Sequence, residues 1–157
     1  MHYDDLTPCT YFEGETQGKL LAVGWLEGEH PYVRGGADEA LLDRLFELLI
    51  KPWNPLFFMG YHECSLCEHE IFHISHNGKT VRVGNLNLFV PGDGRLYSAP
   101  SLIVHYILAH GYAPPQEFCD AVLRCPSMQS AEYIRAIAAN GPASYTVILS
   151  QHHTTKQ

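Results

Sequence analysis

Two cysteines separated by two residues, Cys64 and Cys67, lie near the middle of the 157-residue chain. Thiolates at this spacing can both reach one Zn²⁺ ion at about 2.3 Å, and for this reason structural zinc sites use it. A single pair supplies only part of a tetrahedral ligand set. A chain that holds zinc here must therefore fold so that another segment meets the Cys-x-x-Cys turn.

His105 and His110 are candidates for the other two ligands. Four residues separate them, which lies within the range found between the histidines of Cys2His2 sites. The segment around them is apolar on every side, so we expect a buried helix, in which each imidazole needs a partner. Alternatively, His105 could bond a backbone carbonyl and His110 could cap the end of the helix.

The fourth ligand is open between two residues. A step of five residues turns through about 140° on an ideal helix, so His110 can join His105 at one ion only if the last helical turn unwinds. His62, two residues before Cys64, is the substitute. The predicted cofactor is thus one Zn²⁺ ion held by Cys64, Cys67, His105 and either His110 or His62. It would connect a sheet to a helix across the 37 residues between Cys67 and His105.

The remaining segments predict an α+β fold. A leucine stripe on one face indicates an amphipathic helix from Asp38 to Lys51. Asn77-Gly78 between two β-rich runs is a strong hairpin signal, with residues 69–76 as the first strand. Further strands are expected at residues 19–26, 56–60, 80–83, 86–90, 96–98 and 145–149, and helices at 101–110, 115–124 and 129–139. The middle strands should form an antiparallel β-meander, covered by a C-terminal helical layer and clipped by the zinc ion.

Composition bounds the classes of protein. We expect one domain over residues 1–157, with residues 1–10 and 151–157 frayed. Acidic side chains outnumber basic ones by 17 to 10, a formal net charge of −7, which argues against a nucleic-acid partner. The longest apolar runs, about ten residues, are too short to span a membrane. The N-terminus shows no secretory signal and the cysteine count of 5 is odd, so we expect a cytoplasmic protein with reduced thiols.

Three blocks of sequence carry a family resemblance. They are Gly60 to Cys67, with the pattern G-x-H-x-C-x-x-C; Tyr97 to Tyr106, with Y-x-A-P-x-L-I-x-H-Y; and His110 to Phe118, with H-x-Y-x-P-P-x-x-F. In these blocks the chain resembles an uncharacterised family of small bacterial proteins, loosely over residues 10–125. The resemblance implies His62, Cys64, Cys67, His105 and His110 as candidate ligands, and it implies no reaction.

Two further motifs suggest enzymes but fit poorly. His69 to His73 spells H-E-x-x-H, which binds zinc only on a helix; on a strand, four residues rise about 13 Å, too far for one ion. His62 to Cys67 partly matches the nucleobase deaminase pattern, but the required Glu and the long gap before the cysteine pair are missing. Cys119 and Cys125 fit packed apolar positions better than a nucleophile.

Three functions remain open. The first is a small zinc-binding module with a closed, structural Cys/His site, which acts by binding an unidentified protein. The second is a metal-dependent hydrolase with an open zinc site and a bound water, in which Glu63 or Glu68 is the base. The third is an acidic immunity-type or interaction protein that neutralises a basic partner, in which any metal is incidental. The number of protein ligands separates the first two, and a contiguous acidic face would favour the third.

Overall fold

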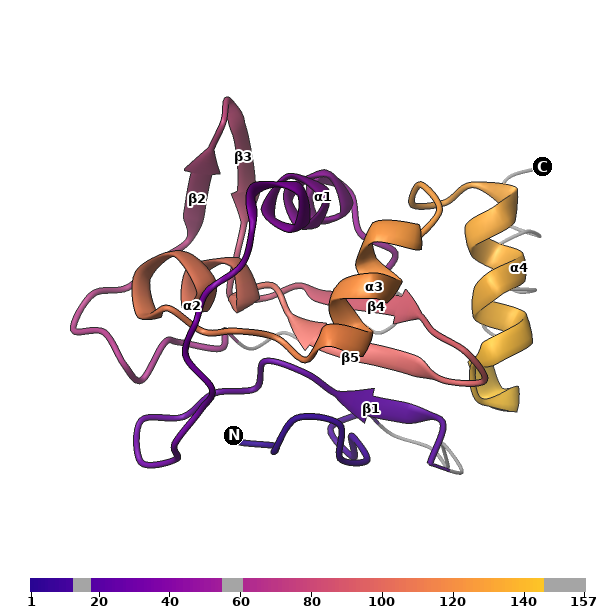
Figure 1. Cartoon of the computed structure of the whole chain (residues 1–157), viewed down its shortest axis with the longest axis horizontal. Coiled ribbons are helices and arrows are strands. Elements are labelled where there is room, and N and C mark those ends of the chain that lie inside the picture. The colour runs from indigo at the N-terminus through magenta and orange to yellow at the C-terminus, as the bar shows by residue number, and fades with distance from the viewer. Residues whose placement is uncertain (13–17, 55–60, 146–157) are drawn as a thin grey trace.

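The computed structural model describes residues 1–12, 18–54 and 61–145 (Figure 1). Its elements follow in the order β1 (Leu20–Ala22), α1 (Glu39–Ile50), β2 (His73–His76), β3 (Lys79–Arg82), β4 (Asn87–Pro91), β5 (Leu96–Pro100), α2 (Ile103–His110), α3 (Gln116–Arg124) and α4 (Ala131–Asn140). The fold class is α+β, as predicted. In Figure 1, α2 lies at one end of the larger sheet and α4 lies at the other.

Within the described residues, the larger sheet has three strands in the order β1-β5-β4. The central strand, β5, runs antiparallel to β4 and parallel to β1. A tight turn joins β4 to β5, where the N–H of Gly92 donates to the carbonyl of Arg95 at 2.8 Å. A parallel pair needs a long crossover instead, and α1 and the β2–β3 hairpin occupy the chain between β1 and β5. The helix α2 follows the central strand β5 closely in the sequence.

The hairpin at Asn77-Gly78 is confirmed. Both residues have positive φ, 48° and 76°, as the tight turns of two-residue hairpins require. The strand β2 covers residues 73–76 rather than 69–76, although Phe72 still accepts a hydrogen bond from the N–H of Val83 at 2.9 Å. Residues 69–72 are irregular.

The single antiparallel meander predicted for the middle strands is wrong. In the part of the chain that the structure describes, β2 and β3 form a separate two-stranded sheet, and β3 does not pair with β4. The chain changes direction at Gly84, which has a φ of 101° and donates its N–H to Ser101 Oγ at 2.9 Å. This bend lies between β3 and β4 and ends the run of extended backbone.

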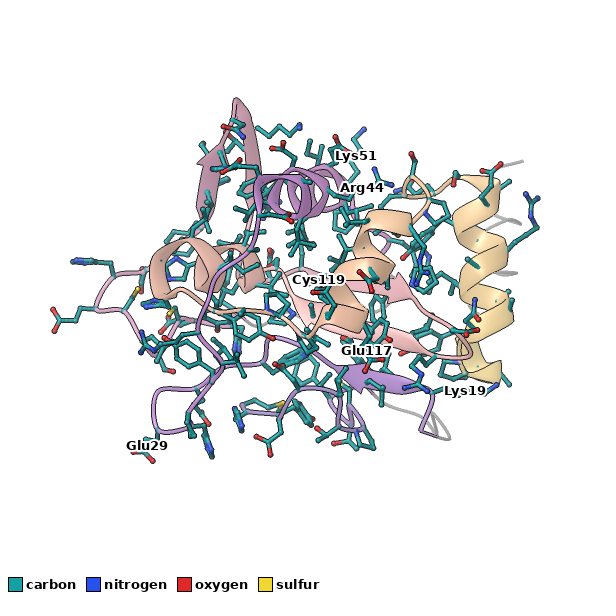
Figure 2. The ribbon with its side chains drawn as sticks, viewed as in Figure 1. Lys19, Glu29, Arg44, Lys51, Glu117 and Cys119 are labelled. Atoms are coloured by element: carbon teal, nitrogen blue, oxygen red, sulfur yellow. The ribbon has the colours of Figure 1, made fainter. Side chains whose placement is uncertain are left out.

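The predicted amphipathic helix is confirmed as α1. Asp38 caps its first turn by accepting a hydrogen bond from the N–H of Leu41 at 2.9 Å. Its apolar side chains are buried against β3 and α3, namely Leu41, Leu42, Leu45, Phe46, Leu48 and Leu49. Arg44, labelled in Figure 2, donates to Glu47 at 2.8 Å and also to the carbonyl of Cys125, so it joins α1 to the end of α3.

Backbone hydrogen bonds join the N-terminal segment to β1. Leu6 donates its N–H to the carbonyl of Ala22 at 2.8 Å, and Cys9 donates to the carbonyl of Leu20 at 2.9 Å. Cys9 is fully buried. These bonds hold residues 6–9 along β1, where they satisfy backbone groups that the edge of the sheet would otherwise expose.

The three C-terminal helices are confirmed, with starts one or two residues later than predicted and ends that differ by at most one residue. None of the helices in the described residues is long and apolar enough to cross a membrane. The predicted strand at residues 56–60 and the tail at 151–157 lie outside the described residues. Of the predicted strand at 145–149 only Tyr145 is described, and its backbone is helical.

Candidate metal centre

The two cysteines lie at the ends of a tight turn. The N–H of Cys67 donates to the carbonyl of Cys64 at 3.4 Å, and Ser65 and Leu66 form the turn between them. A second loop supports this turn, because the N–H of Gly28 donates to Ser65 Oγ at 2.8 Å. Cys64 is buried, whereas Cys67 is partly exposed.

The two histidines lie on α2, which follows β5 almost directly. Its residues from Ile103 to Ile107 are buried, including His105, which is 6% exposed. His110 is the last residue of the helix, and Gly111 follows it in the left-handed conformation with a φ of 65°, as is common at helix C-termini. The last turn of α2 is intact, although unwinding was the condition expected for His110 to join His105 at one ion. The two rings instead converge from adjacent sides of the helix, with their centroids 4.9 Å apart and their planes at 88°.

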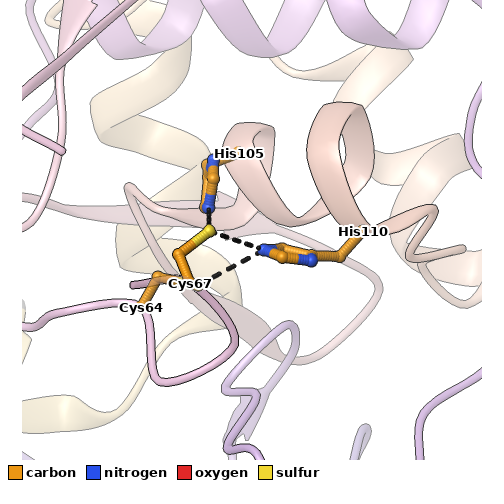
Figure 3. A group of neighbouring side chains, drawn as sticks. All are labelled: Cys64, Cys67, His105 and His110. Carbon is orange, nitrogen blue, oxygen red and sulfur yellow. Dashed lines mark hydrogen bonds between the residues drawn. The ribbon is translucent and has the colours of Figure 1, made fainter. Parts of the chain in front are cut away.

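Four of the five predicted ligands come together. One ligand atom from each of Cys64, Cys67, His105 and His110 lies within 4.8 Å of the other three. Cys67 Sγ is 3.2 Å from His105 Nε2 and 3.1 Å from His110 Nε2, while Cys64 Sγ is 3.5 Å from His110 Nε2 (Figure 3). Around one zinc ion with ordinary bond lengths, sulfur and nitrogen ligands lie about 3.5 Å apart at the corners of a tetrahedron. The arrangement is therefore close to the one that a single metal ion requires.

The lowered pKa values of the two histidines favour metal binding. Burial lowers the pKa of His105, and the neighbouring His110 lowers it further. Burial also lowers the pKa of His110, with a contribution from the positive charge of Arg34. Both imidazoles are therefore held in the neutral form, which is the form that binds a metal. Burial raises the pKa of Cys64, and a bound cation would reverse that effect because it favours the thiolate.

A loop before α1 holds the end of α2 that carries His110. Tyr32 donates its hydroxyl hydrogen to the carbonyl of His110 at 3.0 Å. The N–H groups of Gly35 and Gly36 both donate to the carbonyl of Gly111 at 2.9 Å. These bonds satisfy carbonyl groups that the end of a helix leaves without partners. The sequence analysis did not predict this support, because a Gly-Gly pair indicates a turn but not the partner of its N–H groups.

His62 lies outside the group of four. The His62 ring packs edge-on against Trp25, with 5.9 Å between the ring centroids, and the backbone N–H of His62 donates to the carbonyl of Gly84 at 2.6 Å. Its Nε2 atom is buried without a hydrogen-bond partner in the described part of the chain, and burial lowers its pKa. The geometry favours His110 over His62 as the fourth member of the group.

The H-E-x-x-H segment does not form a helix. His69 lies in an irregular stretch and His73 begins β2, and both are exposed. The zinc-protease geometry, which needs both histidines on one helical face, is therefore absent at these residues.

A second, partly exposed group brings ligand atoms of Glu39, Asp43 and His76 within 4.8 Å of one another. His76 Nε2 lies 3.1 Å from Glu39 Oε2, and Asn77 Nδ2 donates to both carboxylates at 3.0 and 3.1 Å. Hydrogen bonds between α1 and the hairpin account for this group without a metal.

The fold and the site thus define an α+β protein with a largely buried Cys2His2 group that can hold a metal ion. The chain belongs to the family described as a domain of unknown function, DUF7919, whose model matches residues 1–123. All four residues of the group lie within this range, whereas α4 follows it. No curated protein and no solved structure matches the chain significantly. The family membership agrees with the resemblance to an uncharacterised family and brings no reaction with it.

Proposed function

We propose that the protein is a zinc-binding module in which Cys64, Cys67, His105 and His110 hold one Zn²⁺ ion with a structural role. The observation that carries the proposal is the convergence of two thiols and two imidazoles, with sulfur–nitrogen distances of 3.1 to 3.5 Å. Two thiolates and two imidazoles are a ligand set that zinc favours over hard cations such as Mg²⁺ or Ca²⁺.

The small size of the group supports a single ion over an iron–sulfur cluster. All four ligand atoms lie within 4.8 Å of one another. A cluster would have to place inorganic sulfides and at least two irons between them. One tetrahedral ion needs no such space.

Ligand number supports a structural site over a hydrolytic one. Catalytic zinc sites keep a coordination position for water, whereas structural sites fill all positions with protein atoms. Four protein donors converge here, so a hydrolase that uses Glu63 or Glu68 as its base would first have to lose a ligand. The ion would instead fix the Cys-x-x-Cys turn to α2. Neither segment belongs to a β-sheet, so no strand pairing holds them together.

The proposed role of the stabilised surface is to bind a protein with a basic, partly apolar face. Tyr61 and Phe72 lie before and after the Cys-x-x-Cys turn and are 53% and 45% exposed. Their rings pack edge-on, with 5.4 Å between the ring centroids. Exposed aromatic side chains of this kind are common at protein interfaces. Glu63, Glu68 and Glu70 are also exposed, and no Lys or Arg occurs from residue 52 to residue 78. Such a surface favours a cationic partner.

Cobalt substitution tests the metal site. Metal-free protein titrated with Co²⁺ should develop the intense visible bands of a tetrahedral thiolate complex at one equivalent, and added Zn²⁺ should remove them. Weak bands typical of six-coordinate cobalt, or no saturation at one equivalent, would overturn the proposed site. His69→Ala is the matched control, because it removes a nearby exposed imidazole and should leave the spectrum unchanged.

Paired affinity captures test the partner. Wild-type protein and the double variant Tyr61→Ser, Phe72→Ser are exposed to the same extract at low and high salt. The proposal expects a basic protein that the wild type enriches, that the variant does not, and that high salt releases. Equal enrichment by both proteins would count against this surface.

A further inference from the structure

We propose that Cys64 and Cys67 form a reversible oxidation site, at which hydrogen peroxide or an organic hydroperoxide converts the two thiols into a disulfide. The consequence for the metal rests on the proposed function, because a disulfide cannot bind zinc as two thiolates do. Oxidation would then release the ion and free the turn from α2.

The geometry of the turn permits this bond. The two Sγ atoms belong to the group whose ligand atoms lie within 4.8 Å of one another. The hydrogen bond from the N–H of Cys67 to the carbonyl of Cys64 closes a four-residue turn, and the Cα atoms at the ends of such a turn lie less than about 7 Å apart. Disulfides span Cα separations of about 4.4 to 6.8 Å. Rotation of the two side chains can therefore close the bond with little movement of the backbone.

The difference in exposure between the two cysteine residues sets the order of events. Cys67 is partly exposed, while Cys64 is only 8% exposed. The peroxide therefore meets Cys67 first. The thiolate of Cys67 attacks the terminal peroxide oxygen and the O–O bond breaks. The products are a sulfenic acid at Cys67 and hydroxide, or an alkoxide when the oxidant is an organic hydroperoxide.

The second step needs only Cys64. Its sulfur attacks the sulfur of the sulfenic acid, the S–O bond breaks, and the leaving hydroxide takes up the thiol proton as water. Overall, two thiols lose two electrons and two protons, and one hydrogen peroxide becomes two waters. A dithiol reductant reverses the change by thiol–disulfide exchange.

The other three cysteines are poorly placed for the same chemistry. Cys9 and Cys125 are buried, at 0% and 4% exposed. Cys119 lies on α3 (Figure 2), and its thiol donates to the carbonyl of Pro114 at 3.6 Å. Burial raises the pKa of Cys119 and of Cys125 to about 11, so both are thiols rather than reactive thiolates at neutral pH. Oxidation should therefore be confined to the Cys-x-x-Cys turn.

The test compares zinc-loaded and zinc-free full-length protein treated with hydrogen peroxide. Peptide mapping by mass spectrometry locates the disulfide, and a chromophoric chelator follows released zinc. We expect a Cys64–Cys67 disulfide in both samples, faster in the zinc-free one, with one zinc released per disulfide in the loaded one. Dithiothreitol followed by Zn²⁺ should restore the starting material.

Single variants test the order of attack. In Cys64→Ser, a sulfenic acid should accumulate at Cys67 and be trapped by dimedone. In Cys67→Ser, oxidation at Cys64 should be slower by roughly tenfold or more. Cys119→Ser is the control and should form the disulfide at the wild-type rate.

The outcomes separate this inference from the proposed function. If zinc binds with one ion per chain but peroxide produces no Cys64–Cys67 disulfide, or oxidises Cys119 first, the inference is wrong and the structural site stands. If the protein binds no zinc, the proposed function fails, and the zinc-free sample still decides whether the thiol pair is an oxidation site.

Discussion

Cys67 Sγ lies 3.2 Å from His105 Nε2, although the two residues are 38 positions apart in the chain. The hairpin, β4 and β5 all lie between them in the sequence. The contact is therefore a product of the tertiary fold, and an ion at this point would join the Cys-x-x-Cys turn to a buried helix that packs against the core. Loss of the ion should therefore lower the stability of the whole protein, and not only disorder its four ligands.

Removal of a thiolate should remove the metal and destabilise the protein. Cys64→Ser and Cys67→Ser should each abolish zinc binding. A ligand present at about 1,000 times its Kd adds about 4 kcal/mol to the free energy of unfolding, which corresponds to a fall in Tm of roughly 8–16 °C for a protein of this size. Scanning calorimetry measures the effect. The variants His69→Ala and His73→Ala are the controls, because both histidines are exposed. Cysteine variants with the same Tm as the wild type would contradict the account.

The two alternative histidines should behave differently. His110→Ala should weaken zinc binding strongly, because it removes one of the four converging ligand atoms. His62→Ala should leave the zinc stoichiometry at one per chain. It should lower the free energy of unfolding only by the loss of packing on Trp25. Titration with zinc in the presence of a competing chelator distinguishes them. The opposite pattern would assign the fourth position to His62.

The hydrogen bond from Tyr32 to the His110 carbonyl should contribute to metal affinity. Tyr32→Phe removes a bond worth about 1 kcal/mol and should raise the Kd for zinc by about fivefold. Tyr3→Phe is the matched control, since its hydroxyl bonds Thr10 instead. Equal zinc affinities in the two variants would show that the loop before α1 does not position His110.

Asp5 should make stability depend on pH in a defined direction. Burial raises its pKa above the usual 3.8, even though Gly24 N–H and the Tyr112 hydroxyl donate to the carboxyl at 2.9 and 2.8 Å. The native state therefore retains this proton to a higher pH than the unfolded chain does. As a result, the contribution of Asp5 to the free energy of unfolding falls as pH rises from about 4 through the raised pKa.

The variant Asp5→Asn cannot titrate, so it isolates this effect. The free energy of unfolding of the variant minus that of the wild type should increase with pH across this window and level off above it. Urea denaturation at a series of pH values measures both, and any acid-induced release of metal cancels in the difference. A difference that stays flat or decreases with pH would contradict the assignment.

Local patterns made much of the fold predictable. The leucine stripe and Asp38 indicated α1, and Asn77-Gly78 indicated the hairpin, because both signals act within a few residues. The pairing of β1 with β5 was not predictable in this way, since residues far apart in the sequence form it. The split between the two sheets depends on the bend at Gly84, whose positive φ is not apparent from the sequence alone.

The candidate site was predictable for a similar reason. The spacing of Cys64 and Cys67 and the apolar surroundings of His105 are local features. The choice between His110 and His62 was not, because it depends on where the turn meets α2. The expectation that His110 could join His105 only if the last turn of α2 unwound was wrong. The 140° step describes positions on the helix backbone, whereas long side chains can converge on a point beside the helix.

The zinc content of the purified protein tests the central claim most directly. Protein prepared without chelator is analysed by inductively coupled plasma mass spectrometry beside Cys67→Ser prepared in the same way. The account predicts one zinc per chain in the wild type and less than about a tenth of that in the variant. Wild-type protein without zinc that also fails to take up added zinc, or a variant that retains the full amount, would contradict it.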